Sequence, residues 1–273
     1  MKVVLFCGGL GTRLREHSET IPKPLVNVGY RPILWHLMRY YAHYGHKDFI
    51  LCLGYRGDLI REFFLNYRDE MATDFVMNSG GREIELLRPG IDDWRITFVN
   101  TGMHSNLGQR LLRVRHLLEG EKMFLANYSD GLSDLPLDDY VAEVERRKPI
   151  ASLLAVRPSQ SFHAVRTGPD GNVTELREVS TSDYWINAGF FCLRNEIFDY
   201  LREGEELVIE PFNRLIQANR LYAYKYDGFF AAMDTFKDKI KLDRMEAQGD
   251  CPWMVWERDE QSDGRRDPRQ RTS

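Results

Sequence analysis

Short apolar runs alternate with helical patterns through the first half of the chain, and this order constrains the fold more than any other feature. Apolar runs of strand length occur at residues 3–7, 49–53, 94–99 and 122–126. Apolar side chains recur at helical spacing over residues 33–41, 59–67 and 111–118. Because parallel strands need crossover connections and helices supply them, this order predicts a mostly parallel sheet with helices on both faces.

The second half is richer in short strands, which we expect to extend the sheet. Strand patterns occur at residues 151–156, 173–176, 185–193 and 221–226. Helices are expected over residues 137–147, 194–202 and 210–218. Residues 71–93 are expected to form a polar loop, because Ser79-Gly80-Gly81 is a turn signal. The chain is therefore predicted to be one Rossmann-like α/β domain over residues 1–256, with a mixed, mostly parallel sheet and a small β extension. The charged tail, residues 257–273, is predicted to be disordered because it lacks large apolar residues.

Charge and composition exclude several classes of protein. The formal net charge of -4 gives no general attraction to nucleic acid or to an anionic membrane, so neither is an expected partner. No stretch approaches the roughly eighteen apolar residues of a membrane span, and the first apolar run is too short for a signal peptide. The cysteines are scattered without a CxxC pair, which argues against a zinc site or a disulfide framework. A reducing cytoplasm is the expected location.

The first apolar run breaks into the glycine-rich segment Gly8-Gly9-Leu10-Gly11-Thr12-Arg13. Glycines let a backbone turn sharply and approach a ligand, and N–H groups after a strand can bind phosphate oxygens. Arg13 and Lys23 add two cations, and Lys23 is fixed between Pro22 and Pro24. An ordinary strand-to-helix turn with surface cations is the alternative. The combination of glycines, two cations and a stiff proline pair favours a phosphate-binding loop.

Two aspartates follow strand patterns far apart in the chain. Asp130 comes directly after the strand that ends near residue 126, and Asp234 precedes a helix-like stretch. Ligands of open α/β sheets bind beyond the carboxyl ends of the strands, where both carboxylates could meet. Two carboxylates suit Mg²⁺, a hard cation with oxygen ligands. The alternatives are a turn residue for Asp130 and a helix N-cap for Asp234.

These motifs resemble those of the sugar nucleotidyltransferases, the sugar-1-phosphate pyrophosphorylases. That family opens with a strand, a G-G-x-G-T-R-L loop and a P-K-P segment, here residues 8–14 and 22–24. Within the family, the sequence is most similar to the glucose-1-phosphate cytidylyltransferases. The stretches that carry this similarity are residues 32–45, 48–64, 185–191, 233–239 and 252–256. The resemblance extends over almost the whole chain, up to about Glu257.

The resemblance implies a nucleotide-diphospho-sugar transferase-like fold and Mg²⁺-dependent nucleotidyl transfer. It assigns nucleotide binding to Gly8, Gly9, Gly11, Thr12, Arg13, Lys23 and Arg110. Arg13 and Lys23 would also act in catalysis. It assigns the metal to Asp130 and Asp234, and the acceptor to His163, Glu178 and Asn187.

The acceptor half of the predicted site departs from the family pattern. The family's Glu-Lys-Pro segment, whose lysine anchors the sugar phosphate, reads Glu178-Val179-Ser180 here. Loss of that lysine removes a charge-assisted contact that is typically worth about 1.5–3 kcal/mol. Either His163 or Arg166 supplies the missing cation, or the acceptor is not glucose 1-phosphate.

The predicted reaction is transfer of CMP from CTP to a phosphorylated acceptor such as glucose 1-phosphate, with release of pyrophosphate. The alternatives are a uridylyl- or thymidylyltransferase, a cytidylyltransferase with another phosphorylated acceptor, and an inactive nucleotide-binding module. The last is disfavoured because Lys23 and both aspartates are retained, whereas a binder gains nothing from groups that stabilise the transition state. The long excursion at residues 68–93 would allow a homo-oligomer.

Overall fold

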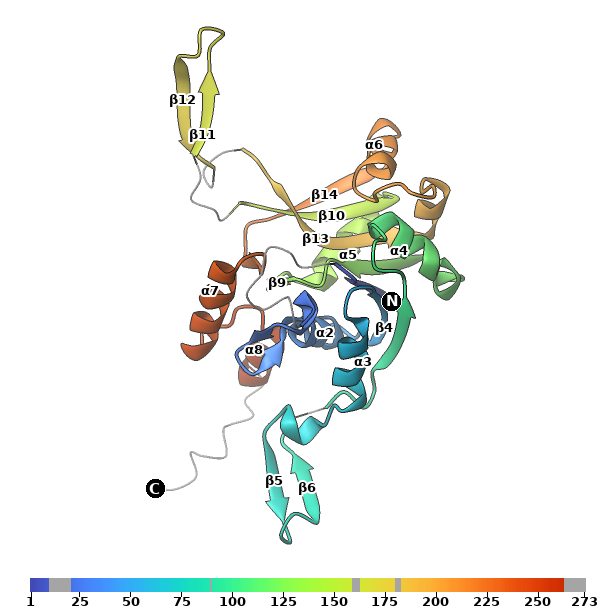
Figure 1. Ribbon diagram of the computed structural model, residues 1–273, viewed down its shortest axis with the longest axis vertical. Helices are drawn as coiled ribbons and strands as arrows, with labels where there is room; N and C mark the ends of the chain where they lie inside the picture. Colours follow the sequence, from blue (N-terminus) through green and yellow to red (C-terminus); the bar gives the residue numbers. More distant parts are fainter. Residues whose placement is uncertain (10–20, 89, 159–162, 180–182, 263–273) are drawn as a thin grey trace.

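A computed structural model describes residues 1–9, 21–88, 90–158, 163–179 and 183–262, with the backbone alone for residues 259–262. Its centre is a seven-stranded sheet (Figure 1). The strands lie in the order β14 (Leu221–Tyr226), β10 (Ala151–Val156), β13 (Ile186–Arg194), β8 (Met123–Asn127), β1 (Lys2–Cys7), β4 (Asp48–Leu53) and β7 (Arg95–Asn100). The strand β13 runs antiparallel to both of its neighbours, and the other neighbouring strands pair in parallel. The prediction of a mixed, mostly parallel sheet is confirmed.

Helices cover both faces of this sheet, as predicted. Alternate residues of a strand point to opposite faces, and here both sets are apolar. On β1, Val3 and Leu5 belong to one buried cluster, and Val4 and Phe6 belong to another. The first cluster includes side chains of α2 (Ile33–His43), α3 (Gly57–Leu65), α5 (Leu137–Arg147) and α7 (Phe236–Ala247). The second includes side chains of α4 (Leu107–Val114) and α6 (Glu210–Gln217).

One helix prediction needs correction. Within the predicted helix 194–202, the structure has a short 3₁₀ helix, Asn195–Asp199. The Tyr200 N–H donates to the Ile197 carbonyl three residues earlier, which is the 3₁₀ pattern, and the guanidinium of Arg214 donates to the Tyr200 carbonyl. The helix α8 (Val255–Ser262) extends into the first residues of the predicted charged tail. Trp256 at the start of α8 is buried, and this burial anchors the charged turns that follow. Residues 263–273 lie outside the described residues.

Two hairpins project from opposite ends of the molecule (Figure 1). One is formed by β5 (Phe75–Asn78) and β6 (Glu83–Leu86), and the other by β11 (His163–Thr167) and β12 (Val173–Glu178). The polar loop predicted for residues 71–93 is therefore partly wrong. Its turn signal was read correctly, but four residues on each side of it alternate and pair as strands. None of the described helices is long and apolar enough to span a membrane.

Candidate active site

A small pair of antiparallel strands brings the two predicted carboxylates together. The strand β9 (Gly131–Ser133) pairs with β15 (Phe230–Ala232), and Gly131 lies opposite Ala232. The Met233 N–H donates to the carbonyl of Asp130, with an N–O distance of 2.8 Å. Asp130 comes just before β9 and Asp234 comes two residues after β15. This pairing therefore carries both aspartates to one place beyond the carboxyl end of β8.

Lys23 joins the two aspartates. Its ammonium nitrogen lies 2.6 Å from Asp130 Oδ2 and 2.7 Å from Asp234 Oδ1. Lys23 begins a short 3₁₀ helix, η2 (Lys23–Leu25), which is preceded by Pro22 and includes the buried Pro24. Since proline fixes its own φ angle, the pair restricts where the lysine can point. Three residues that are distant in sequence thus form one cluster, the Lys23–Asp130–Asp234 cluster.

The electrostatics of this cluster favour binding of a further cation. Burial opposes the charge on Lys23, but the two carboxylates outweigh it and the pKa of the ammonium is raised. Burial raises the pKa of the Asp130 carboxyl, and Lys23 offsets this only in part. When all three groups are ionised, two carboxylates face one ammonium, so the cluster formed by these three described residues has a net charge of -1. A divalent cation bound at the aspartates would give the cluster a net positive charge.

The donor set fits Mg²⁺. Magnesium commonly takes one or two protein carboxylates and completes its shell with water and substrate phosphates. The described residues contain no group of three or more His, Cys, Asp or Glu side chains suited to a metal ion. Asp130 and Asp234 would therefore hold the ion together with ligands that the substrate supplies. The Lys23 ammonium contacts one oxygen of each of these carboxylates.

The local structure argues against the alternative roles of both aspartates. The N-cap of α7 is Thr235, whose hydroxyl accepts from the Asp238 N–H in a capping box. Asp234 is therefore not the capping residue. The turn before Asp130 is formed by Ser129, whose φ of 70° lies in the left-handed region, while the Asp130 carboxylate points to Lys23. Both carboxylates are thus available for a ligand.

Arg110, which the resemblance assigned to nucleotide binding, contacts the protein backbone in this structure. Its side chain is buried, and its guanidinium donates to backbone carbonyls at the ends of three strands. These bonds include Gly8 O at 2.9 Å, Gly102 O at 3.0 Å and Leu53 O at 3.3 Å, with Thr101 Oγ1 at 2.8 Å. Through these bonds Arg110 supports the loops around the site, and its predicted contact with the nucleotide stays a prediction.

The same arginine explains the first glycine of the predicted phosphate-binding loop. A Cβ atom on Gly8 would lie 2.0 Å from Arg110 Nη1, so the guanidinium would have to move away from the Gly8 carbonyl. Gly9 is exposed, and a Cβ there would meet no atom of the described residues within 4 Å. The predicted roles of Gly11, Thr12 and Arg13 fall outside the described residues.

The three predicted acceptor residues lie on two different elements. Asn187 is on β13, and its side-chain amide donates to the Tyr128 hydroxyl at 3.0 Å. His163 and Glu178 are directly opposite each other in the β11–β12 hairpin and both are exposed. Arg166, the other candidate for the missing cation, forms an ion pair with Glu175 at 3.4 Å. Because Arg166 already has a carboxylate partner, His163 is the better of the two candidates for the missing cation.

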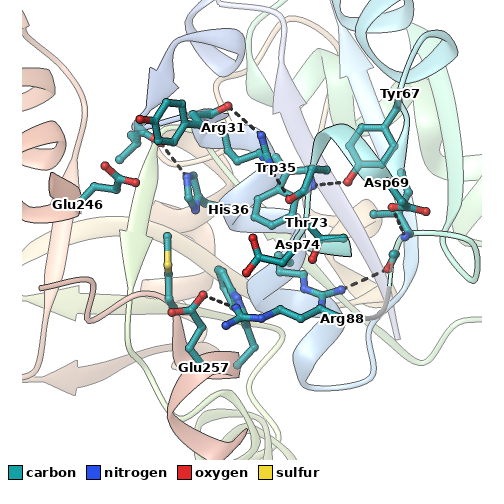
Figure 2. Close-up of a pocket in the computed structure, with 18 residues that line it drawn as sticks. Arg31, Trp35, His36, Tyr67, Asp69, Thr73, Asp74, Arg88, Glu246 and Glu257 are labelled. Carbon is teal, nitrogen blue, oxygen red and sulfur yellow. Dashed lines mark hydrogen bonds and ion pairs between the residues drawn. The ribbon is translucent and has the colours of Figure 1, made fainter. Parts of the chain in front are cut away.

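A cavity of about 320 Å³ lies elsewhere, between α2, residues 67–74 and the C-terminal segment. Figure 2 shows Trp35 and His36 on one side of it, with Arg88 and Glu257 below them. None of the predicted site residues lines this cavity.

Sequence reasoning missed two contributors to the site. Tyr128 contacts Asn187 across the β8–β13 pair, and Thr101 accepts a hydrogen bond from Arg110. The signal for Tyr128 was present, because it immediately follows the strand that leads to Asp130. No pattern marks Thr101, because its partners Leu53 and Arg110 lie on a different strand and on a helix.

Similarity to known proteins shows that the chain is an enzyme that transfers nucleotidyl groups. Residues 2–230 match the Nucleotidyl transferase family, and the chain belongs to that family. It is 36% identical over 259 residues to the glucose-1-phosphate cytidylyltransferase of Salmonella typhimurium, across 94% of this chain and 100% of that protein. It is 35% identical over 258 residues, with the same coverage, to a Bacillus subtilis protein described as a probable glucose-1-phosphate cytidylyltransferase. The resemblance to sugar nucleotidyltransferases is thereby confirmed.

A solved structure supports the fold independently. The structure of a UDP-glucose pyrophosphorylase complexed with UDP-glucose superposes with a TM-score of 0.67 and covers 91% of this chain and 98% of that chain. At 16% sequence identity, this likeness shows a shared fold and carries no information on substrate. The predicted nucleotide-diphospho-sugar transferase-like fold is confirmed.

Proposed function

We propose that this enzyme transfers CMP from CTP to a sugar 1-phosphate, with glucose 1-phosphate as the first acceptor to test, and releases pyrophosphate. The observation that carries the proposal is the convergence of Lys23 with Asp130 and Asp234 at the carboxyl edge of the sheet. Full-length similarity to glucose-1-phosphate cytidylyltransferases supports the choice of CTP and of the acceptor. The free cysteines fit a cytoplasmic location.

The acceptor needs no general base in this reaction. A phosphate monoester has its second pKa near about 6, so its oxygen is already ionised at neutral pH. That oxygen attacks the α-phosphorus of CTP, and the bond from this phosphorus to the β-phosphate oxygen breaks. The electron pair leaves with pyrophosphate. The enzyme therefore has to overcome repulsion between two polyanions and the charge that grows on the leaving group.

Each residue of the cluster has a role in that task. Lys23 would move from the aspartates to the α-phosphate and neutralise charge in the transition state. The N–H groups that begin at Gly9, together with Arg13, would bind the departing pyrophosphate. Mg²⁺ bound at Asp130 and Asp234 would supply charge screening and Lewis acidity. Arg110 would hold Gly8 in place behind the loop.

The acceptor could differ from glucose 1-phosphate, and one observation favours a second candidate. Val179 stands where the family has its phosphate-anchoring lysine, and the described neighbour Arg166 is paired with Glu175. An acceptor with its phosphate or its hydroxyls placed differently would not need that lysine. The second candidate is therefore a CMP transfer to another phosphorylated acceptor.

The test measures pyrophosphate release by the purified enzyme with Mg²⁺. CTP, UTP and dTTP are each combined with glucose 1-phosphate and with a panel of other sugar phosphates. We expect turnover with CTP and one sugar 1-phosphate, and the product should be identified as the corresponding CDP-sugar. Faster turnover with UTP or dTTP would replace cytidylyl transfer by another nucleotidyl transfer. CTP binding without pyrophosphate release across the whole panel would contradict the proposal.

A further inference from the structure

A buried hydrogen bond connects two parts of the proposed site from beneath. The thiol sulfur of Cys7 lies 3.3 Å from the hydroxyl oxygen of Ser129, and both residues are fully buried. Cys7 is the last residue of β1 and directly precedes Gly8 of the predicted phosphate-binding loop. Ser129 directly precedes Asp130. The bond therefore joins the strand from which the loop departs to the turn that carries a predicted metal ligand.

The backbone of Ser129 has a conformation that serine rarely adopts. Its φ of 70° lies in the left-handed region, where a Cβ atom is disfavoured and glycine is the usual residue. The Ser129 N–H donates to Asn127 Oδ1 at 2.9 Å, a bond that glycine could also make. What serine has and glycine lacks is the hydroxyl, and this group contacts Cys7. The bond to Cys7 is therefore the interaction that favours a serine in this strained turn.

The turn is also fixed on its other side. Asn127 is buried at the end of β8, and its amide donates to the hydroxyl of Tyr41 on α2 at 3.2 Å. Burial raises the pKa of the Cys7 thiol to about 12, so the thiol is neutral at pH 7 and can share a hydrogen with the Ser129 hydroxyl. Buried polar side chains that satisfy one another specify a single arrangement of the elements that carry them. These four side chains thus fix α2, β1, β8 and the turn relative to one another.

We infer that Cys7 and Ser129 are positioning residues, whose hydrogen bond sets where the Asp130 carboxylate lies relative to the phosphate-binding loop. The inference rests on the proposed function, because that proposal assigns Asp130 to the metal. Asp130 is the next residue after Ser129, so a rotation of the strained backbone would turn its carboxylate away from Lys23 and Asp234. Since Cys7 and Ser129 are fully buried, they act through Asp130 and do not touch the substrate.

The test is isothermal titration of CTP into the full-length enzyme without an acceptor, once with Mg²⁺ and once with EDTA. The dissociation constant in EDTA divided by that in Mg²⁺, the metal ratio, gives the contribution of the metal to binding and needs no turnover. Cys7→Ala and Ser129→Ala should each lower the metal ratio by about threefold to tenfold, which is typical of one lost hydrogen bond. CTP binding in EDTA should change less than about twofold, because the phosphate-binding loop itself is unaltered.

A merely structural role is excluded by two further variants. Cys192→Ala is the matched control, because Cys192 is a buried cysteine of the same apolar cluster but lies on β13. It should lower the free energy of unfolding about as much as Cys7→Ala, measured by urea titration, and leave the metal ratio unchanged. Cys7→Ser keeps a hydrogen-bonding group and should retain most of the metal ratio. Cys7→Ala combined with Ser129→Ala should lose no more than either change alone, because both remove the same contact.

The outcomes separate this inference from the proposed function. Unchanged metal ratios in Cys7→Ala and Ser129→Ala would overturn the inference, even in an enzyme that transfers CMP. Losses that add in the double variant, or no recovery in Cys7→Ser, would also overturn it. So would a wild type that binds CTP equally well in Mg²⁺ and in EDTA. The expected ratios in a wild type that releases no pyrophosphate with any acceptor would refute the proposed function and support the positioning role.

Discussion

Lys23 and Arg110 are both cations at the carboxyl edge of the sheet, but their surroundings differ in kind. Lys23 contacts two carboxylates that face an open site, and its pKa is raised. Arg110 is buried among carbonyl oxygens, and burial lowers its pKa. Phosphates and a metal ion can take over the contacts of Lys23. Withdrawal of Arg110 would leave buried carbonyls without donors. The partners of a cation therefore tell a ligand-binding group from a structural one better than its position does.

The largest effect on activity should come from a substitution in the Lys23–Asp130–Asp234 cluster. Lys23→Ala is expected to lower kcat at least a hundredfold, about 3 kcal/mol of transition-state stabilisation, because no other group in the cluster can neutralise the α-phosphate. The measurement is pyrophosphate release at saturating CTP and acceptor. Lys47→Ala is the matched control, since Lys47 also pairs with an aspartate, Asp93, but lies before β4 at the other end of that strand. Normal turnover by Lys23→Ala would refute its catalytic role.

Substitution of Arg110 should lower the stability of the fold more than it slows the reaction. Arg110→Met keeps the length of the side chain but leaves the carbonyls of Gly8 and Gly102 without a donor. We expect a loss of about 3 kcal/mol in the free energy of unfolding, measured by urea titration. Arg95→Met is the control, because Arg95 pairs with Asp48 at an exposed position and should cost less than about 1 kcal/mol.

The two sites can then be compared kinetically. If Arg110 acts by holding Gly8, Arg110→Lys should raise the KM for CTP more than it lowers kcat, because the loop is displaced while Lys23 is intact. An equal fall in kcat for Arg110→Lys and Lys23→Ala, with unchanged stability of the Arg110 variant, would mean that Arg110 reaches the substrate after all.

A third basic side chain, His36, extends the comparison to the pH dependence of stability. His36 is buried and faces the Val28 carbonyl, and burial lowers its pKa from 6.5 to about 4. The unfolded chain takes up this proton below pH 6.5 and the folded chain does not, so stability falls as the pH drops from about 6.5 toward 4. His36 is expected to contribute a loss of about 2 kcal/mol between pH 7 and pH 5, and His46, whose pKa is also lowered to about 4 mainly by burial, adds to it. Urea titrations at both pH values should show this difference in the wild type and a smaller one in His36→Gln. An unchanged difference would exclude His36 as its source.

The sequence was a good guide wherever one element determines the answer. The helix predicted at residues 137–147 and the strand at 221–226 agree with α5 and β14 to the residue. Their apolar periodicity is strong because each packs one face on the core. The aspartates were also placed in the right kind of position, after strands at the carboxyl edge. The proposed division into one domain and a tail stays a prediction.

The sequence was a poor guide wherever a contact joins distant elements. Arg110 has the charge of a phosphate ligand, and only the positions of Leu53, Thr101 and Gly8 reveal that its donors are taken. The β5–β6 hairpin was missed because each strand has only four residues, too few for a clear period. The β9–β15 pair is shorter still, although it brings the aspartates together.

The antiparallel strand β13 also has a consequence for how the protein is made. It occupies the middle of the sheet, between β10 and β8, yet it is synthesised after both. As the nascent chain leaves the ribosome, β8 can join β1 early, but its other edge stays bare until residue 194 has emerged. An uncovered central edge is a template for pairing with other chains. Fragments that stop before β13 should therefore aggregate, and translation has to pass two thirds of the message before the sheet can close.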